Sequence, residues 1–347
     1  MRIRGIGRVR RAASWIGNRL GSRALVLLYH RVTDSISPDP FLLSVTPQHF
    51  GEQIAILRGH GQLMQLHQLA SALRDGKLPR RAAAITFDDG YANNLHHAKP
   101  LLERYDVPAT VFVTAAYVGQ EREFWWDELE RLLLQPGKLP NLLDLKVNGT
   151  PCHWELGDAA VYSSEEYSRY CSWTVREDEP GPRQRLYRSL YQLLRPLADS
   201  ERCQLLNELT AWAGSERTVR PSHRALSAQE VVELATGGLV EIGAHTMTHP
   251  ALAELPPAEQ TREIQGSKSR LMEILNQTVV SFAYPFGSRR HYTSETAAIV
   301  QQAGFGSACS GFSGLVCPGT DRFQLPRFVM RNWDGDAFAQ QLREWCS

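Results

Sequence analysis

Short apolar runs alternate along the chain with stretches in which apolar residues recur every three or four positions. The first pattern is typical of strands buried on both faces, and the second of helices that cover a sheet. Strands and helices that alternate in this way predict an α/β fold with a parallel sheet or barrel. The predicted strands are 24–29, 82–87, 109–114, 239–244, 279–284 and 304–310, and the predicted helices between them are 47–59, 93–105 and 258–275.

The stretch 121–225 interrupts this alternation. Its recognisable patterns are two amphipathic helical stretches, 127–134 and 183–213, and one hairpin signal, Asn148-Gly149. We interpret the stretch as a helical insertion of about 100 residues in a barrel that otherwise runs over 24–347. Two interpretations stay open: a lid over a binding site, and an embellishment without a role in binding.

Composition and charge narrow the classes of function. A chain of 347 residues with 43% apolar and 22% charged residues is typical of a globular protein with a sizeable core. Its formal net charge of +1 argues against a nucleic-acid partner. Its six cysteines include no Cys-x-x-Cys pair, which favours free thiols in a reducing compartment.

The segment 1–23 is basic and amphipathic, with seven Arg and no acidic residue. Arg8, Arg10 and Arg11 interrupt every apolar run, so the segment lacks the core of a signal peptide. As a helix it would present an apolar stripe flanked by Arg, which suits an anionic membrane surface. A solvated tail, a first helix packed on the barrel and a transit peptide are the alternatives. We expect a cytoplasmic protein that makes peripheral contact with the inner membrane face through 1–23.

Polar residues or turns follow four of the predicted strands where each strand ends. Loops after the carboxyl ends of strands build the active sites of α/β folds, so these residues are expected to share one pocket. The four strand ends are Tyr29-His30, Asp88-Asp89-Gly90-Tyr91, His245-Thr246-Met247-Thr248-His249-Pro250 and Tyr284-Pro285-Phe286-Gly287.

His245 and His249 are spaced to face one metal ion. A lone pair of this kind is usually a surface accident, but a carboxylate from Asp88 or Asp89 would complete a three-ligand site with open positions. Two adjacent carboxylates repel each other unless a cation or a proton relieves them. The other Asp of the pair is then the obvious base for water activation. Zn²⁺ suits these ligands, as do Fe²⁺, Co²⁺, Ni²⁺ and Mn²⁺.

Two motifs resemble the signatures of the polysaccharide deacetylase family (carbohydrate esterase family 4). They are Thr86-Phe87-Asp88-Asp89-Gly90 and His245-Thr246-Met247-Thr248-His249-Pro250, and the similarity extends over about 25–116 and 226–338. The resemblance implies a distorted (β/α)₇ barrel and metal-dependent removal of N-acetyl groups from an amino-sugar glycan or its precursor. It also implies that Asp88 is the catalytic base, that Asp89, His245 and His249 bind the metal, and that the backbone N–H of Tyr91 helps to hold the oxyanion.

The sequence departs from this family in two places. Ala283 stands where the third family motif carries an Arg, and Arg327 is our candidate replacement. The Leu-x-His motif that supplies the general acid occurs at the start of the chain, as Leu28-Tyr29-His30. This order resembles the circularly permuted barrel of the poly-N-acetylglucosamine deacetylases and implies that His30 is the acid. A neighbouring carboxylate is expected to raise the pKa of His30. The alternative is a His satisfied by a backbone carbonyl.

Pro285, Phe286 and Trp333 are further candidates for substrate contact, because they follow predicted strands. Trp125 and Trp126 would join them if the insertion folds over the site, although core packing is the ordinary alternative for aromatic residues. The substrate is expected to be an N-acetylated glycan or a lipid-linked sugar. Three rival functions remain: a metal-dependent hydrolase of a non-sugar amide, a non-haem iron oxygenase, and a catalytically silent carbohydrate-binding homologue.

Overall fold

The computed structural model describes residues 23–34, 38–59 and 61–346. The chain divides into two compact units: the first comprises Met1–Ser35, Leu43–Gly119 and Ala225–Ser347, and the second comprises Ile36–Leu42 and Gln120–Arg224. The expected insertion, 121–225, corresponds to the second unit, to which the structure adds the short segment Ile36–Leu42. The amphipathic segment 1–23 lies outside the described residues except for Arg23.

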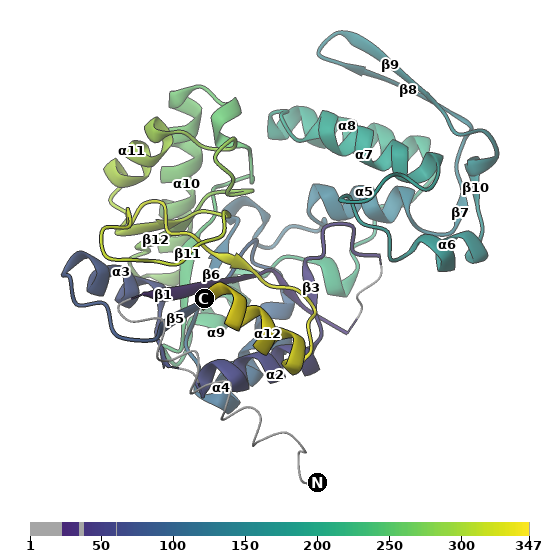
Figure 1. Cartoon of the computed structure of the whole chain (residues 1–347). Helices are drawn as coiled ribbons and strands as arrows, with labels where there is room; N and C mark the ends of the chain where they lie inside the picture. The colour runs from purple at the N-terminus through teal and green to yellow at the C-terminus, as the bar shows by residue number, and fades with distance from the viewer. Residues whose placement is uncertain (1–22, 35–37, 60, 347) are drawn as a thin grey trace. The chain divides into compact units, whose positions relative to one another are not determined.

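The first unit is built on an eight-stranded sheet with the strand order β13-β12-β11-β6-β5-β1-β14, and β4 pairs with β5 beside this path (Figure 1). The pairings within it are parallel. The strands are β1 (Ala24–Tyr29), β4 (Gln62–Leu63), β5 (Ala82–Phe87), β6 (Ala109–Val113), β11 (Val240–Ala244), β12 (Ser281–Ala283), β13 (Ser307–Cys309) and β14 (Phe328–Val329).

One segment connects the two edges of this sheet. Leu325 forms a parallel bridge with Cys309 at the end of β13, and Phe328 then pairs with Leu27 of β1. The sheet therefore curls into a barrel, and the predicted α/β barrel is confirmed. β1 is the first strand of the chain but lies inside the sheet, between β5 and β14, as the permuted order requires.

Two apolar layers hold the barrel together. In β1, Leu25 and Leu27 belong to the core between sheet and helices, whereas Ala24 and Val26 belong to the second core. All six residues of β1 are buried, which explains why this strand reads as a continuous apolar run. The helices of this unit are α2 (Pro47–Arg58), α3 (Leu66–Arg74), α4 (Lys99–Tyr105), α9 (Ala228–Ala235), α10 (Pro257–Leu275), α11 (Ser294–Gln302) and α12 (Gly335–Cys346).

The predicted helix 93–105 is not α-helical throughout. It begins with a π-helical turn, η1 (Asn94–Ala98), and continues as α4. Pro100 has no N–H to donate to the carbonyl four residues earlier, so the α-helical pattern cannot extend back across this point. The N–H of Lys99 instead donates to the carbonyl of Asn94, which closes the wider π turn.

The second unit mixes helices with short strands, so the expected helical insertion is only partly helical. The predicted hairpin is confirmed: Val147 pairs with Thr150, and Asn148 and Gly149 between them have φ values of +49° and +81°. The elements of this unit are α5 (Trp125–Leu133), β7 (Gly137–Lys138), β8 (Leu142–Val147), β9 (Thr150–Glu155), η3 (Gly157–Ala160), β10 (Val161–Tyr162), α6 (Ser164–Tyr170), α7 (Pro182–Leu194), α8 (Asp199–Trp212) and η4 (Pro221–His223).

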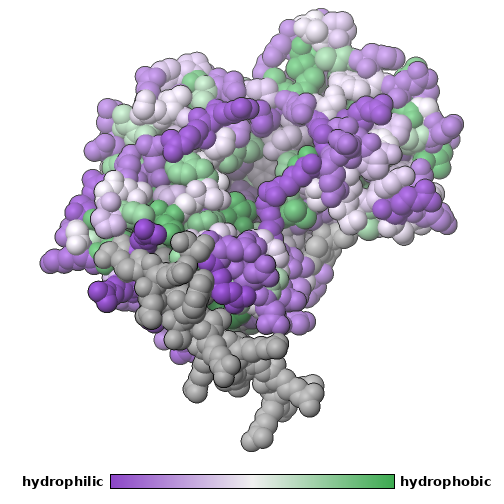
Figure 2. Space-filling model, in the orientation of Figure 1, coloured by the Kyte–Doolittle hydropathy of each residue, from purple (hydrophilic) through white to green (hydrophobic). Residues whose placement is uncertain are grey.

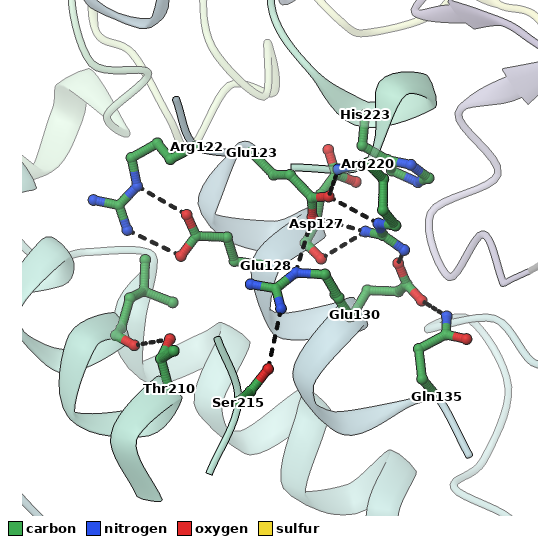
Figure 3. A network of polar contacts seen from close by, with 12 residues as sticks. Arg122, Glu123, Asp127, Glu128, Glu130, Gln135, Thr210, Ser215, Arg220 and His223 are labelled. Carbon is green, nitrogen blue, oxygen red and sulfur yellow. Dashed lines mark hydrogen bonds and ion pairs between the residues drawn. The ribbon is translucent and has the colours of Figure 1, made fainter. Parts of the chain in front are cut away.

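A buried ionic network joins the beginning and the end of the long segment of this second unit (Figure 3). The guanidinium of Arg220 donates to both carboxylate oxygens of Glu123, each at 2.9 Å, and also to Glu130. Glu123 is fully buried and Glu130 is 2% exposed. Because an unpaired buried carboxylate is costly, Arg220 is expected to hold the two ends of the segment together.

The face drawn in Figure 2 is a mosaic of hydrophilic areas and smaller hydrophobic areas. Among the residues that the structure describes, no helix combines the length and the apolar character needed to cross a membrane.

Candidate metal centre and active site

The two predicted motifs meet at one edge of the barrel, because parallel strands present their carboxyl ends on the same side. Asp88 and Asp89 follow β5, and His245 and His249 follow β11, with β6 between the two strands. An Oδ1 atom of Asp89 lies 3.6 Å from Nε2 of His245 and 3.4 Å from Nε2 of His249. These three buried residues offer ligand atoms that all lie within 4.8 Å of one another.

Both motifs adopt backbone conformations that aim their side chains into the site. Asp89 has a φ of +74°, and Thr246 and His249 have φ values of +64° and +57°. L-residues seldom adopt this left-handed region, and such strain clusters at functional sites. Position 90 favours glycine for two reasons. Its φ of +84° is costly for other residues, and a Cβ there would lie 3.1 Å from a methyl group of Val113.

A backbone carbonyl orients the first histidine. The Nδ1–H of His245 donates to the carbonyl oxygen of Ala283 at 2.8 Å, which leaves the Nε2 lone pair for the side that faces Asp89. Ala283 is the residue that stands in place of the family's Arg, so this position contributes through its backbone. The third motif thus still serves the metal site, although it supplies no charge.

Arg327, which directly precedes β14, reaches the site from a third segment of the barrel. Its guanidinium donates to the two carboxylate oxygens of Asp88, each at 2.7 Å, and to the carbonyl of Ser310, also at 2.7 Å. Arg327 is fully buried. Burial by itself would raise the pKa of Asp88, but the charges of Arg327 and His245 outweigh it and lower the pKa to about 2. Asp88 is therefore ionised at neutral pH and has a fixed orientation.

The second carboxylate has the opposite electrostatic character. Burial raises the pKa of Asp89 above its ordinary value, and the neighbouring charge of Asp88 adds to the effect, against His30 and His245. A buried carboxylate next to two imidazoles gains from a cation. The environments of Asp88 and Asp89 thus shift the pKa values of the two carboxyl groups in opposite directions.

His30 follows β1 at the same edge of the barrel. Its backbone carbonyl accepts from the Nδ2 atom of Asn94 at 2.8 Å, and Asn93 accepts from the N–H of Val32 at 3.2 Å, so the η1 region supports this strand end. The expected influence of a neighbouring carboxylate is present, but the net pKa of His30 is lowered. Burial lowers the pKa, and this outweighs the opposite influence of the Asp89 and Asp88 carboxylates.

The other predicted substrate contacts are only partly brought to the site. The ring of Phe286 packs edge-on against His249, with 4.8 Å between centroids, and Pro285 before it is buried. Tyr91 directly follows Gly90, but its side chain is fully buried, and the guanidinium of Arg31 lies 5.5 Å from its ring centroid. The side chain of Tyr91 is therefore not available to a ligand.

Trp125 and Trp126 are buried, whereas Trp333 is partly buried and packs against the core. The ring of Trp333 contacts Trp345 of α12 at 6.0 Å between centroids. In the second unit, Trp125 stacks on Tyr191 at 4.8 Å and is 1% exposed, while Trp126 is 5% exposed. For Trp125 and Trp126, burial removes the exposed face that a sugar platform needs.

Two polar residues that act on the site were not among the sequence candidates. Asn94 holds the carbonyl of His30, and Glu263 of α10 accepts hydrogen bonds from the loop between His245 and His249. Glu263 lies in an amphipathic helical pattern, where a single Glu reads as a solvated surface residue. No local signal distinguishes it from its exposed neighbours.

The polysaccharide deacetylase family model matches two segments of the chain, residues 75–138 and 209–308. The first segment contains Asp88 and Asp89, and the second contains His245 and His249. Residues 139–208 between them, which belong to the second unit, are not matched.

Two curated relatives carry related names. A poly-beta-1,6-N-acetyl-D-glucosamine N-deacetylase of Staphylococcus aureus (strain MSSA476) is 32% identical over 110 residues, which are 28% of this chain and 38% of the relative. The putative polysaccharide deacetylase YxkH of Bacillus subtilis (strain 168) is 25% identical over 122 residues, 35% of this chain and 42% of the relative. The chain thus spans less than half the length of these relatives.

Solved structures share the fold over most of the chain. The Streptococcus pyogenes deacetylase PplD in complex with acetate superposes with a TM-score of 0.57 at 17% identity, over 94% of this chain and 99% of that one. IcaB from Ammonifex degensii superposes with a TM-score of 0.56 at 18% identity, over 94% and 97%. Family model, relatives and folds agree, and they confirm the resemblance of this chain to the polysaccharide deacetylase family.

Proposed function

We propose that this chain is a metal-dependent hydrolase that removes N-acetyl groups from an amino-sugar glycan or a glycan precursor. The observation that carries the proposal is the buried cluster of Asp89, His245 and His249 beside the ionised carboxylate of Asp88. One carboxylate oxygen and two imidazole nitrogens within 4.8 Å of one another fit a catalytic metal site with an open position. A divalent cation such as Zn²⁺ or Co²⁺ supplies, when bound, Lewis-acid activation of water and of the amide carbonyl.

The side chains of the protein supply the proton transfers. Asp88 accepts a proton from the attacking water, whose oxygen forms a bond to the carbonyl carbon. The geometry suits this role, because Arg327 fixes both oxygens of Asp88 and leaves the carboxylate ionised. His30 in its protonated form gives a proton to the amide nitrogen as the C–N bond breaks, and the backbone N–H of Tyr91 donates to the oxyanion. Acetate and a free amine are the products.

The names of the relatives favour a sugar substrate over a non-sugar amide. The Staphylococcus aureus relative is named for N-acetyl-D-glucosamine. Retention of Asp88, Asp89, His30 and both metal-binding histidines argues against a catalytically silent homologue. An oxygenase is disfavoured, because this site lies on a deacetylase-like barrel.

Acetate release tests the reaction class. Purified protein is incubated with N-acetylglucosamine oligomers and with lipid-linked N-acetyl sugars, before and after chelation, and then with Zn²⁺ or Co²⁺ restored. We expect chelator-sensitive release that returns with the metal. No release from any of these substrates by the metal-loaded protein would contradict the sugar assignment.

Two substitutions test the roles of the paired carboxylates. Asp88→Asn is expected to retain metal and to lose about 10²- to 10⁴-fold in turnover, because it removes the base without removing a ligand. Asp89→Asn is expected to lose metal, because an amide is a poor ligand for this site. Metal content measured by mass spectrometry decides between them, and unchanged content in Asp89→Asn would overturn the assignment.

The segment 1–23 bears on where the substrate is presented. Its Arg-rich, acid-free composition supports a peripheral contact with anionic lipid and a lipid-linked substrate on the cytoplasmic side. Flotation with vesicles that contain anionic lipid compares the full chain with a chain that starts at Ala24. Equal flotation of the two proteins would refute the contact.

A further inference from the structure

The loop that carries the metal-binding histidines is held from two sides. On one side, the carbonyls of Thr246 and Met247 accept from the N–H groups of Ala115 and Ala116, at 3.0 Å and 2.9 Å. These bonds attach the loop to η2 (Ala115–Tyr117), the short helix after β6. They engage carbonyls only, so the N–H groups of the same loop need a different acceptor.

A single carboxylate provides that acceptor. One oxygen of Glu263, Oε2, accepts from the N–H groups of Met247 and Thr248 at 2.8 Å and 2.9 Å. The other oxygen, Oε1, accepts from the hydroxyl of Thr248 at 2.8 Å. Glu263 lies on α10, a helix of 19 residues that contacts both β11 and η2, so its position is set by the scaffold.

The conformation of the loop explains why it needs this support. Thr246 has a φ of +64° and His249 a φ of +57°, in the left-handed region that costs an L-residue energy. Such a conformation persists only when surrounding contacts over-determine it. Thr246 contributes locally, since its hydroxyl accepts from the N–H of His249 at 3.0 Å. Glu263 holds the two residues between Thr246 and His249.

We propose that Glu263 is a positioning residue that sets the metal affinity of this site by fixing the loop from His245 to His249. The inference rests on the proposed function, because it takes His245 and His249 as metal ligands. Glu263 acts through the backbone of Met247 and Thr248 and contacts no ligand side chain by these three bonds. We therefore expect the effect of Glu263 on metal affinity to depend on the length of its side chain, which places the oxygens, more than on its negative charge.

Three substitutions separate reach from charge. Glu263→Gln keeps the length, and its amide oxygen still accepts from the two N–H groups while its amide nitrogen donates to the Thr248 hydroxyl. Glu263→Asp keeps the charge but withdraws the oxygens by about 1.5 Å, one C–C bond, which breaks hydrogen bonds of this length. Glu263→Ala removes both. Glu259→Gln on the same helix is the matched control, since Glu259 is partly exposed and forms an ion pair with Arg262 at 3.3 Å.

The measurement is the dissociation constant for Zn²⁺, by competition with a chromophoric chelator, together with the visible spectrum of the Co²⁺ form. We expect Glu263→Ala and Glu263→Asp to weaken metal binding about 10- to 100-fold and to change the Co²⁺ spectrum, as loss of an outer support for ligands does. Glu263→Gln is expected to recover most of the affinity, and Glu259→Gln to match the wild type. If Glu263→Ala does not fold, the comparison of Asp with Gln decides the question.

The possible failures are distinguishable. Wild-type protein that binds no Zn²⁺ would remove the proposed function itself. Wild-type protein that binds Zn²⁺ with the same affinity as Glu263→Ala and Glu263→Asp would overturn only the role of Glu263. Loss of affinity in Glu263→Gln with retention in Glu263→Asp would also overturn it, because charge and not reach would then be the cause.

Discussion

Replacing Arg327 with Met removes the partner of the presumed base while leaving an unbranched side chain of similar length. Arg327 is fully buried and makes two hydrogen bonds of 2.7 Å to Asp88, so the substitution leaves the Asp88 carboxylate buried without its principal counter-charge. The substitution leaves the candidate metal ligands Asp89, His245 and His249 unchanged. The variant also removes the hydrogen bonds of Arg327 to the Ser310 carbonyl and the Thr86 hydroxyl, at 2.7 Å and 3.2 Å.

The structure sets the size of the effect. The pKa of Asp88 lies at about 2 instead of 3.8, and at about 1.4 kcal/mol for each pKa unit this gap corresponds to about 2–3 kcal/mol of stability. Breaking a buried ion pair by removing one partner costs about 3–5 kcal/mol. Because the folded-state pKa is depressed, the stabilisation is present above pH 3.8 and is lost as pH falls through about 2. At neutral pH we expect Arg327→Met to lose about 2–5 kcal/mol.

Two assays follow the consequences. Denaturant unfolding of the chelated protein at neutral pH measures the stability difference without a contribution from metal. Acetate release by the metal-loaded protein measures turnover, which is expected to fall by about 10²-fold because Asp88 loses its fixed orientation. Arg322→Met, in the same segment, is the control. Arg322 lies over the ring of Phe323 at 5.1 Å, an interaction worth only about 0.5–1 kcal/mol at a surface.

Wild-type behaviour of Arg327→Met would refute both proposed roles of Arg327. If Arg327→Met unfolds at the same denaturant concentration as wild type and releases acetate at the same rate, the ion pair neither stabilises the barrel nor orients the base. A loss of stability with full activity would separate the two claims, leaving Arg327 as a structural residue. Equal losses in Arg322→Met would show that the segment, and not the ion pair, is responsible.

Two further perturbations probe polar contacts away from the metal centre. Arg220→Met leaves Glu123 buried without the partner that donates to it twice, each at 2.9 Å, so unfolding should be easier by about 3–5 kcal/mol; an unchanged denaturation midpoint would contradict this. His67 hydrogen-bonds Glu241 at 3.1 Å, which raises the pKa of His67 above 6.5. Since the folded-state pKa is raised, wild-type protein should lose this stabilisation as pH rises from about 6.5 through the higher folded value, and His67→Gln should not; parallel pH profiles of unfolding would refute the coupling.

The strands and the hairpin could be predicted because their signals are local. The residues of β1 and β5 are apolar in sequence apart from Thr86, and all of them are buried in the barrel, so a nearly continuous apolar run predicts each strand directly. Asn148-Gly149 adopts the left-handed turn that its residue types favour. The start of α4 was harder, since Pro100 turned part of a regular pattern into a π turn.

The candidate site could be predicted only as far as its residues are neighbours in sequence. Asp88-Asp89 and the His245–His249 pair each carry their spacing in the chain, and parallel strands bring such ends to one edge. The sign of the pKa change at His30 could not be read from its neighbours, because it depends on how deeply the fold buries the ring. The burial of Trp125 in the second unit likewise follows from packing.

The sequence by itself determined the strands, the hairpin turn, the Asp88-Asp89 pair and the spacing of His245 and His249, because each depends on adjacent or periodically spaced residues. Only the tertiary structure decided which distant groups support them. Arg327 meets Asp88 across 239 positions, and Glu263 reaches the backbone of Met247 from α10. Such contacts form only when the barrel closes and the helices pack on it. Ion pairs and hydrogen bonds depend on the distance between two groups in the folded protein, and not on their separation along the chain.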